Sequence, residues 1–445
     1  MLKKVEISHQ TPKEIAKKMD EYIIGQDDAK KSVAIAFVNR GRRMMIKDEV
    51  LRGEICPKNV LLSGPTGVGK TEIARRVADI TDSPFMKVEM TKFTEVGYAG
   101  KDVESIIRDL VALTIKRERD KMNKSHQEQA KKDAIDYVAK AMEKFGIKDV
   151  DKKKLANGDY DNQEIQIEMP EGIKVSSKED DMEREMPFGS GVSAMISVIP
   201  LFEIGGSKKK KEKELKTMKV RDALEAYANN EVLEYVDKNL IIADVLKKIE
   251  QKGVIFLDEI DKLISNKENQ SRGEVSREGV QRDLLPIIEG TLVQTKYGAV
   301  RTDHILFIAA GAFHDNKISD LMPELQGRFP VQVSLKSLTA KEFEKILTDV
   351  RYNLLEQQKT LMEVDGITIE FQPDGIKAIA ELAYKMNSEL ENTGARRLYS
   401  VMESVMEEAS FTGKKGSKFV IDKKYVEKAT ENIFAKKVNV RKYTI

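Results

Sequence analysis

Short apolar runs alternate with helix-forming stretches in the first 115 residues and again in residues 244–336. The four clearest apolar runs are residues 60–62, 85–90, 254–257 and 305–309. Runs of this length are typical of strands that are buried on both faces of a parallel sheet. An amphipathic stretch that opens with the capping box Thr11-Pro12-Lys13-Glu14 predicts a helix to about residue 22. The pattern therefore predicts an α/β fold.

Residues 116–243 have a different pattern, in which Lys and Glu alternate densely and strand-like runs nearly vanish. We expect a helical insertion here. Residues 182–207 contain Pro, Gly and Met without periodicity and precede four lysines, which predicts a mobile stretch. Its Met-rich apolar surface could contact unfolded protein; packing between the insertion's own helices is the favoured alternative. From about residue 337, amphipathic helices with short strands at 367–371 and 419–421 predict a smaller α/β lid.

A complete G-x-x-x-x-G-K-[ST] loop separates the first apolar run from the helix that follows it. The loop is Gly64-Pro65-Thr66-Gly67-Val68-Gly69-Lys70-Thr71, and Glu72 continues the helix. Glycines turn successive backbone N–H groups toward one point, where the helix also presents the positive end of its dipole. We expect Lys70 to bind the β- and γ-phosphates of a nucleotide and Thr71 to bind Mg²⁺. The order strand, loop, helix disfavours the alternative of a chance glycine turn.

The apolar run at residues 254–257 ends in two adjacent acids, Asp258 and Glu259. We expect Asp258 to hold Mg²⁺ and Glu259 to orient or deprotonate a water that attacks the γ-phosphate. Adjacent acids at this place favour hydrolysis over binding alone. Without the phosphate loop, a solvated strand end would be the preferred interpretation.

Composition excludes several classes of site. The chain has 445 residues, with 76 basic and 74 acidic side chains and a net charge of +2, so no global charge favours nucleic acid or an anionic membrane. The single cysteine, Cys56, excludes an internal disulfide and a cysteine zinc module. The four histidines show no metal-ligand spacing, and we found neither a leader nor a run of the roughly 20 apolar residues that span a bilayer. We expect a cytoplasmic protein.

Four signals follow one another along the chain: the phosphate loop, Asp258-Glu259, Gly327-Arg328 after a helix, and Gly394-Ala395-Arg396 at a helix start. In this order they resemble the AAA+ ATPases. Five segments resemble more narrowly the HslU (ClpY) ATPases of the Clp/Hsp100 family: residues 22–27, 64–76, 94–100, 275–286 and 324–328. The resemblance runs nearly end to end, with only the insertion loosely matched. ClpX unfoldases differ, because they have an amino-terminal zinc module and lack the insertion.

The resemblance implies a fold and a domain order. Residues 1–115 and 244–336 would form a discontinuous AAA+ P-loop nucleotide-binding domain, and residues 116–243 the insertion domain. Residues 337–445 would form the C-terminal lid and end in a tail that docks on a peptidase. ATP and Mg²⁺ are the implied ligands.

The resemblance also assigns individual residues to the nucleotide. Ile24 would belong to the adenine pocket, and Glu324 and Arg328 to the intersubunit side of the site. The residues assigned to the phosphates are Gly67, Val68, Gly69, Lys70, Thr71 and Glu72. Asp258 is assigned to Mg²⁺-ATP and Glu259 to hydrolysis.

The resemblance assigns two arginines, Arg328 and Arg396, to the nucleotide, and each assignment has a physical reason. An arginine on a turn at a protomer edge can neutralise charge on a neighbour's γ-phosphate, which contributes on the order of 10³-fold or more in rate. Without the family resemblance, Arg328 would be interpreted as a plain surface arginine. Arg396 would project from the first turn of a lid helix toward the phosphates and couple lid angle to nucleotide state, while Arg397 points about 100° away. Ala310 departs from the superfamily, which often has a polar γ-phosphate sensor there.

The resemblance assigns two further segments to protein contacts. Gly97, Tyr98, Ala99 and Gly100 resemble a pore loop, whose aromatic ring can grip any unfolded chain by area and whose glycines let it swing. Family members usually have valine where Ala99 stands, and a tight turn with an incidental tyrosine is the alternative. Tyr443, Thr444 and Ile445 resemble the tail that such ATPases insert between peptidase subunits; a frayed terminus is the alternative.

We therefore expect an ATP-driven hexameric unfoldase that threads protein substrates into a separate threonine-type peptidase of the HslV (ClpQ) kind and activates it. The chain itself should not be a protease, since no Ser-His-Asp or Cys-His arrangement appears in a supporting motif. Three other functions remain open: a chaperone without a peptidase, a nucleic-acid motor such as a branch-migration helicase, and a nucleotide-gated scaffold that hydrolyses poorly.

Overall fold

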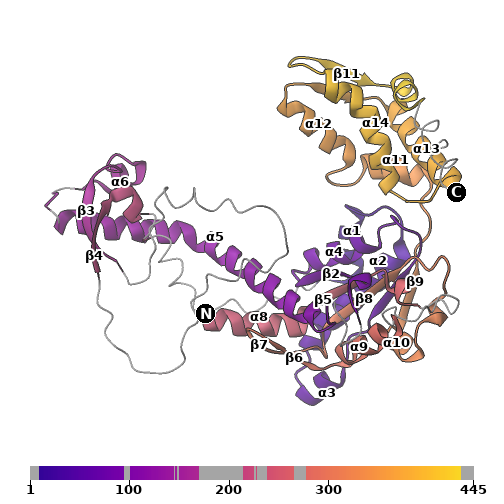
Figure 1. Cartoon of the computed structure of the whole chain (residues 1–445), viewed down its shortest axis with the longest axis horizontal. Helices are drawn as coiled ribbons and strands as arrows, with labels where there is room; N and C mark the ends of the chain where they lie inside the picture. Colours follow the sequence, from indigo (N-terminus) through magenta and orange to yellow (C-terminus); the bar gives the residue numbers. More distant parts are fainter. Residues whose placement is uncertain are drawn as a thin grey trace. The chain divides into compact units, whose positions relative to one another are not determined.

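The computed structural model describes residues 10–94, 101–144, 146–147, 150–169, 214–224, 227, 238–264 and 277–431 (Figure 1). The chain divides into two compact units, one made of Met1–Thr114 with Asp244–Ile445 and the other of Ile115–Ala243. The lid that we expected at residues 337–445 shares the first unit with the phosphate loop.

A five-stranded parallel sheet in the order β2-β5-β8-β1-β9 lies at the centre of the first unit. Its strands are β1 Val60–Ser63, β2 Phe85–Glu89, β5 Val254–Asp258, β8 Leu306–Gly311 and β9 Val331–Ser334. The four predicted strands are thus confirmed as β1, β2, β5 and β8, and the sheet is parallel as expected. The edge strand β9 was not predicted, because it alternates half-buried and exposed residues and has no continuous apolar run.

The amino-terminal helices are α1 Pro12–Asp20, α2 Asp27–Met44, α3 Glu49–Glu54 and α4 Lys70–Ile80. The capping box of α1 is present, since the Thr11 side chain accepts from the Glu14 N–H and Glu14 accepts from the Thr11 N–H. The helix ends at Asp20, slightly before the predicted residue 22. Gly25 and Gln26 then have positive φ angles of 66° and 59°, which start α2 in a new direction.

The segments between the sheet strands position the acids and Arg328. They are η1 Met90–Lys92, α8 Lys238–Lys252, η3 Ile260–Leu263, α9 Arg277–Glu289, β6 Leu292–Thr295, β7 Gly298–Arg301, η4 Ile318–Asp320 and α10 Pro323–Gly327. Strands β6 and β7 pair antiparallel and form a hairpin. The η3 segment follows β5 directly, and α10 ends one residue before Arg328.

The C-terminal part of the first unit contains α11 Ala340–Thr348, α12 Leu354–Val364, β10 Thr368–Phe371, α13 Pro373–Glu389, α14 Arg396–Thr412 and β11 Lys418–Ile421. Both short strands were predicted, and they pair in parallel. Apolar residues of α13 and α14 bury against each other, among them Ile379, Ala383, Val401 and Val405. This helical layer carries Arg396 at the start of α14.

The second unit contains most of α5 Ser105–Lys144, with α6 Lys152–Asn157, β3 Glu164–Met169 and β4 Glu214–Lys219. The expectation that strands nearly vanish is wrong here, because β3 and β4 form an antiparallel ribbon with Ile165 opposite Met218. Ile165 and Ile167 alternate with polar residues, a period-2 pattern that the dense charges of the segment obscured. The unit has its own core: Val138, Ala139, Met142, Leu155, Ile165, Ile167, Val220 and Ala223. None of the described helices combines the length and apolar character needed to cross a membrane.

Candidate nucleotide site

The phosphate loop connects β1 to α4 as the sequence predicts. Gly64, Gly67 and Gly69 have φ angles of 139°, 73° and 102°, a conformation that side chains with a Cβ rarely adopt. Lys70 is the first residue of α4, and its ammonium donates to the carbonyl oxygens of Gly64 and, at 2.8 Å, Pro65. The lysine therefore folds back over the loop, which leads into the N-terminus of α4, and helix N-termini bind phosphates through their backbone N–H groups.

Opposing charges act on Lys70. Burial lowers the pKa of Lys70, while the carboxylates of Asp258 and Asp261 raise it and the charge of Arg396 lowers it further. The lysine is thus close enough to both acids and to Arg396 for their charges to act on it. These four residues come from α4, the end of β5, η3 and α14, which the fold brings together.

The two acids predicted after β5 differ in position. Asp258 ends the strand opposite Glu89, and its Oδ2 pairs with the Lys87 ammonium at 2.9 Å. Glu259 is exposed and has a positive φ of 58°, so the chain turns sharply between the two carboxylates. Asp258 Oδ1 accepts from the Glu259 N–H at 3.1 Å, which stabilises this turn. Asp258 therefore faces Lys87 and the sheet edge, and Glu259 is accessible to water.

The oxygen ligands near the loop suit Mg²⁺ together with a nucleotide. Thr71 and Asp258 offer a hydroxyl and a carboxylate, the hard ligands that Mg²⁺ takes when phosphates and waters complete its shell. Among the described residues, no group of three or more His, Cys, Asp or Glu could hold a metal ion alone. The donor set thus fits Mg²⁺ bound with a phosphate better than a metal site made only of protein.

The start of α14 touches the phosphate loop. Ala395 donates its N–H to the Gly67 carbonyl at 2.9 Å, and Gly394 packs so closely that an added Cβ would lie 2.5 Å from the Thr66 oxygen. Arg396 is exposed one residue further on. Arg397 is buried and donates to Asn387 Oδ1 and the Glu391 carbonyl, so it supports the helix start. The assignment of Arg396 to the phosphates stays a prediction.

Ile24 lies half-buried in the turn between α1 and α2. The neighbouring Ile23 is buried, and an added Cβ on Gly69 would lie 3.9 Å from its side chain, so this turn borders the phosphate loop. Gln26 in the same turn exchanges two hydrogen bonds with the backbone of Lys336, at 2.8 and 3.1 Å. The turn thus lies between the loop and the start of the lid, and the assignment of Ile24 to adenine stays a prediction.

Glu324 and Arg328 lie on α10 and at its C-terminal end. Both are exposed, and Arg328 pairs with Glu289 Oε1 at 2.6 Å. In the part of the chain that is described, the hydrogen bonds and ion pairs of Arg328 do not reach the phosphate loop. Their role at an intersubunit site therefore stays a prediction.

Sequence reasoning missed three charged residues near the site. Asp261 is buried, and its Oδ2 accepts from the Phe313 N–H at 3.2 Å. Its signal was present, because it follows Asp258 by three residues in an uninterrupted motif. Lys87 and Glu289 had no such signal, since only the register of β2 on β5 and the approach of α9 to α10 reveal their partners. Ala310 is fully buried in β8 opposite Leu62, and its methyl group offers no polar atom to a phosphate.

Two predicted protein-contact segments lie outside the described residues. They are Gly97 to Gly100, with Tyr98, and Tyr443 to Ile445. Their assignments to a pore loop and to peptidase docking stay predictions.

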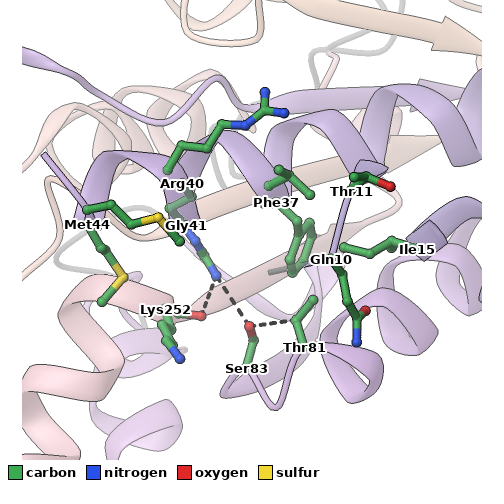
Figure 2. A pocket seen from close by; sticks show the side chains of 13 residues that line it. Gln10, Thr11, Ile15, Phe37, Arg40, Gly41, Met44, Thr81, Ser83 and Lys252 are labelled. Carbon is green, nitrogen blue, oxygen red and sulfur yellow. Dashed lines mark hydrogen bonds between the residues drawn. The ribbon is translucent and has the colours of Figure 1, made fainter. Parts of the chain in front are cut away.

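A cavity of about 260 Å³ lies beside Arg40 in α2 (Figure 2), and its lining residues do not belong to the phosphate loop. Arg40 is buried and donates to the carbonyls of Lys252 and Gly253, each at 2.6 Å, and to Ser83 Oγ at 3.4 Å. Burial lowers the pKa of Arg40 to about 9, so it stays charged at neutral pH. Because these donors meet carbonyls at the C-terminal end of α8, we interpret Arg40 as a helix cap that joins α2 to the sheet.

Three family models match the chain. Residues 60–157 match the ATPase family associated with various cellular activities (AAA), and residues 188–332 match the AAA domain of the Cdc48 subfamily. Residues 1–108 match the MCM P-loop domain. The first match contains the phosphate loop, and the second contains Asp258, Glu259 and Arg328.

Proposed function

We propose that this chain, an ATPase with an AAA+ P-loop domain, is a Mg²⁺-dependent protein unfoldase and translocase of the HslU type. It would act in the cytoplasm as a homohexamer and deliver threaded substrates to a threonine-type peptidase of the HslV kind. The observation that carries the proposal is the convergence on Lys70 of the phosphate loop, the acids after β5 and the start of α14. A site that joins nucleotide, acid and lid in this way can convert hydrolysis into movement of the lid.

Each residue of the site has a defined task. Lys70 and the loop N–H groups bind the β- and γ-phosphates, and Thr71 with Asp258 would hold Mg²⁺. Bound Mg²⁺ neutralises charge on the phosphates. Glu259, exposed beyond the strand end, orients a water toward the γ-phosphate.

Two arginines complete the site in this proposal. Arg396 contacts the phosphates from the lid, since α14 begins at the phosphate loop, where Ala395 donates its N–H to the Gly67 carbonyl at 2.9 Å. Arg328, half exposed, acts on the nucleotide of the neighbouring protomer.

Glu259→Gln tests the assignment of hydrolysis. We expect the variant to bind ATP with little change in affinity while ATP turnover falls by roughly 10²-fold or more. Nucleotide binding and phosphate release, measured on the same samples, separate the two effects. Unchanged turnover would remove Glu259 from the mechanism.

The peptidase partnership needs its own experiment. Peptide cleavage by a threonine-type peptidase should rise when this protein and ATP are both present, and removal of residues 443–445 should abolish the increase. A truncated protein that still stimulates the peptidase would refute tail docking and favour a chaperone without a peptidase.

A nucleic-acid motor is the second candidate, and the match of residues 1–108 to the MCM P-loop domain is the observation that favours it. The balanced charge of the chain disfavours it, because motors of this kind bind phosphate backbones through an excess of basic groups. ATP turnover measured with and without DNA at several salt concentrations decides between them. Stimulation by DNA that falls steeply with salt would favour the motor.

A further inference from the structure

Two buried amide side chains hold the ends of the segment that carries Arg328. We call Met322 to Arg328 the finger segment; it consists of α10 with one flanking residue on each side. Gln281 bonds to its first residue and Asn59 to its last. Both amides are also bonded at their other ends to elements that lead to the nucleotide site.

Gln281 joins the finger segment to the acids after β5. It lies in α9 and is only 1% exposed. Its Oε1 accepts from the Met322 N–H at 3.0 Å, and its Nε2 donates to the Leu263 carbonyl at 2.9 Å. Leu263 ends η3, which follows Asp258 and Glu259 directly. A single side chain therefore connects the hydrolytic acids to the start of α10.

Asn59 joins the finger segment to the amino end of β1, the strand that leads into the phosphate loop. It precedes β1 and is 6% exposed. Its Oδ1 accepts from the Phe307 N–H in β8 at 3.0 Å, and its Nδ2 donates to the Arg328 carbonyl at 3.1 Å. Since β1 runs directly into the loop, the backbone of Arg328 is held against the strand that positions Lys70.

The two amides fix the backbone of the finger segment relative to β8 and η3. An amide has a donor and an acceptor at fixed relative positions, and here each bridges two backbone segments away from water. Phe329, the residue after Arg328, is fully buried and anchors the chain there. The side chain of Arg328 itself remains half exposed.

We propose that Gln281 and Asn59 are positioning residues that set Arg328 relative to its own protomer's nucleotide site and so couple that site to the next one. This inference rests on the proposed role of Arg328 toward a neighbouring protomer. A movement of η3 or β1 on hydrolysis shifts the backbone ends of the finger segment through these bonds. Because misplacement by about 1 Å can reduce a rate by about 10²-fold, small shifts are sufficient.

Mixed rings test the inference. Gln281→Met keeps the length of the side chain and removes both hydrogen bonds, so ATP turnover of a pure sample should fall roughly 10- to 100-fold while the KM for ATP changes less than about twofold. Gln281→Met protein is then mixed with an excess of Lys70→Ala protein, which lacks the phosphate-binding lysine but retains an intact finger segment. ATP turnover, divided by the amount of Gln281→Met protein, should rise back toward the value of the unmodified protein. The restored turnover would come from fingers supplied by the Lys70→Ala neighbours.

Matched mixtures provide the controls. Arg328→Ala mixed with Lys70→Ala must also recover, and Thr302→Val must leave turnover unchanged. Thr302 is as buried as Gln281, but among the described residues its hydroxyl bonds to Thr291 alone, between α9 and the β6–β7 hairpin. If Gln281→Met does not fold, as judged by its thermal transition, Gln281→Glu and Asn59→Asp replace it, since each keeps the acceptor and loses the amide donor.

The outcomes distinguish the positioning role of Gln281 from the intersubunit role of Arg328. Recovery of Arg328→Ala mixtures without recovery of Gln281→Met mixtures overturns the positioning role, because the defect would then lie within the protomer's own site. Undiminished turnover of pure Gln281→Met overturns it as well. Undiminished turnover of pure Arg328→Ala overturns the intersubunit role of the arginine in the proposed function, and the inference with it.

Discussion

The contact between Gly394 and the phosphate loop predicts that one added methyl group weakens ATP binding. In Gly394→Ala the new Cβ would lie 2.5 Å from the Thr66 oxygen and 2.6 Å from the Gly67 carbonyl atoms, whereas ordinary contacts begin at 3.4 Å. The two backbones must therefore separate by about 0.9 Å, the difference between 3.4 and 2.5 Å. All the atoms involved are backbone, so no flexible side chain can yield.

The separation has two energetic consequences. The hydrogen bond from Ala395 to Gly67, now 2.9 Å, is stretched or lost, which costs about 1 kcal/mol. Alanine at the positive φ of 58° costs roughly 1 kcal/mol more. The backbone strain is present with or without ATP, so only the lost hydrogen bond weakens binding. If ATP binds the state in which lid and loop touch, this loss of about 1 kcal/mol corresponds to roughly 5-fold weaker binding, since 1.4 kcal/mol is a factor of ten.

Gly416→Ala is the matched control. Gly416 also lies in the lid and has a positive φ of 89°, but an added Cβ meets no atom within 4 Å. Both variants therefore carry similar backbone strain, and only Gly394→Ala pushes the lid from the loop. We would measure the dissociation constant of a fluorescent ATP analogue and the thermal transition of each. Equal affinity losses in the two variants, or no loss in Gly394→Ala, would refute the reasoning.

Two further predictions concern stability. Burial, reinforced by the charge of Arg43, lowers the pKa of His304. In the unfolded chain the His304 imidazole binds a proton near pH 6.5, whereas in the native state it stays neutral at that pH. The free energy of unfolding therefore falls as the pH drops below about 6.5. We would measure the free energy of unfolding in urea between pH 5 and pH 7 for the unmodified protein and for His304→Gln. The free energy should depend less on pH in the variant, and an equal dependence in both proteins would contradict this. Ile167→Ala, in the separate core of the second unit, should destabilise that unit by about 2–4 kcal/mol. In calorimetry, the second unit of the variant should unfold at a lower temperature, while ATP turnover of the protein stays unchanged. A loss of ATP turnover that parallels the loss of stability would argue against independent units.

Local signals predicted the parts of the fold that depend on neighbouring residues. The phosphate loop needs glycines, a lysine and a following helix within a few positions, and Gly64 to Lys70 supply all of them. The buried strands were recognised because each is continuous and apolar. Short edge strands such as β9 and the ribbon of β3 and β4 are held by pairing with distant strands, so their own sequences carried only weak alternation.

Contacts between distant elements could not be predicted in this way. Gln281 and Leu263 are 18 residues apart, and Asn59 and Arg328 are 269 apart. Nothing in either neighbourhood marks the amide as a bridge, because a buried glutamine in a helix has the same local pattern as an exposed one on another face. Such bridges depend on how α9 and β1 pack against η3 and α10, which only the folded chain determines.

The pair between Arg328 and Glu289 bears on how an arginine can serve a neighbouring protomer. Both side chains are about half exposed, and exposed ion pairs typically contribute less than about 1 kcal/mol. A γ-phosphate carries more charge than one carboxylate and would meet the guanidinium at an interface from which water is excluded, where attraction is stronger. If the Arg328 guanidinium left the Glu289 carboxylate for the γ-phosphate, it would lose little interaction free energy and gain more. In the proposed ring, the Glu289 carboxylate would hold the guanidinium while the protomer is alone and would release it when a nucleotide-bearing neighbour approaches.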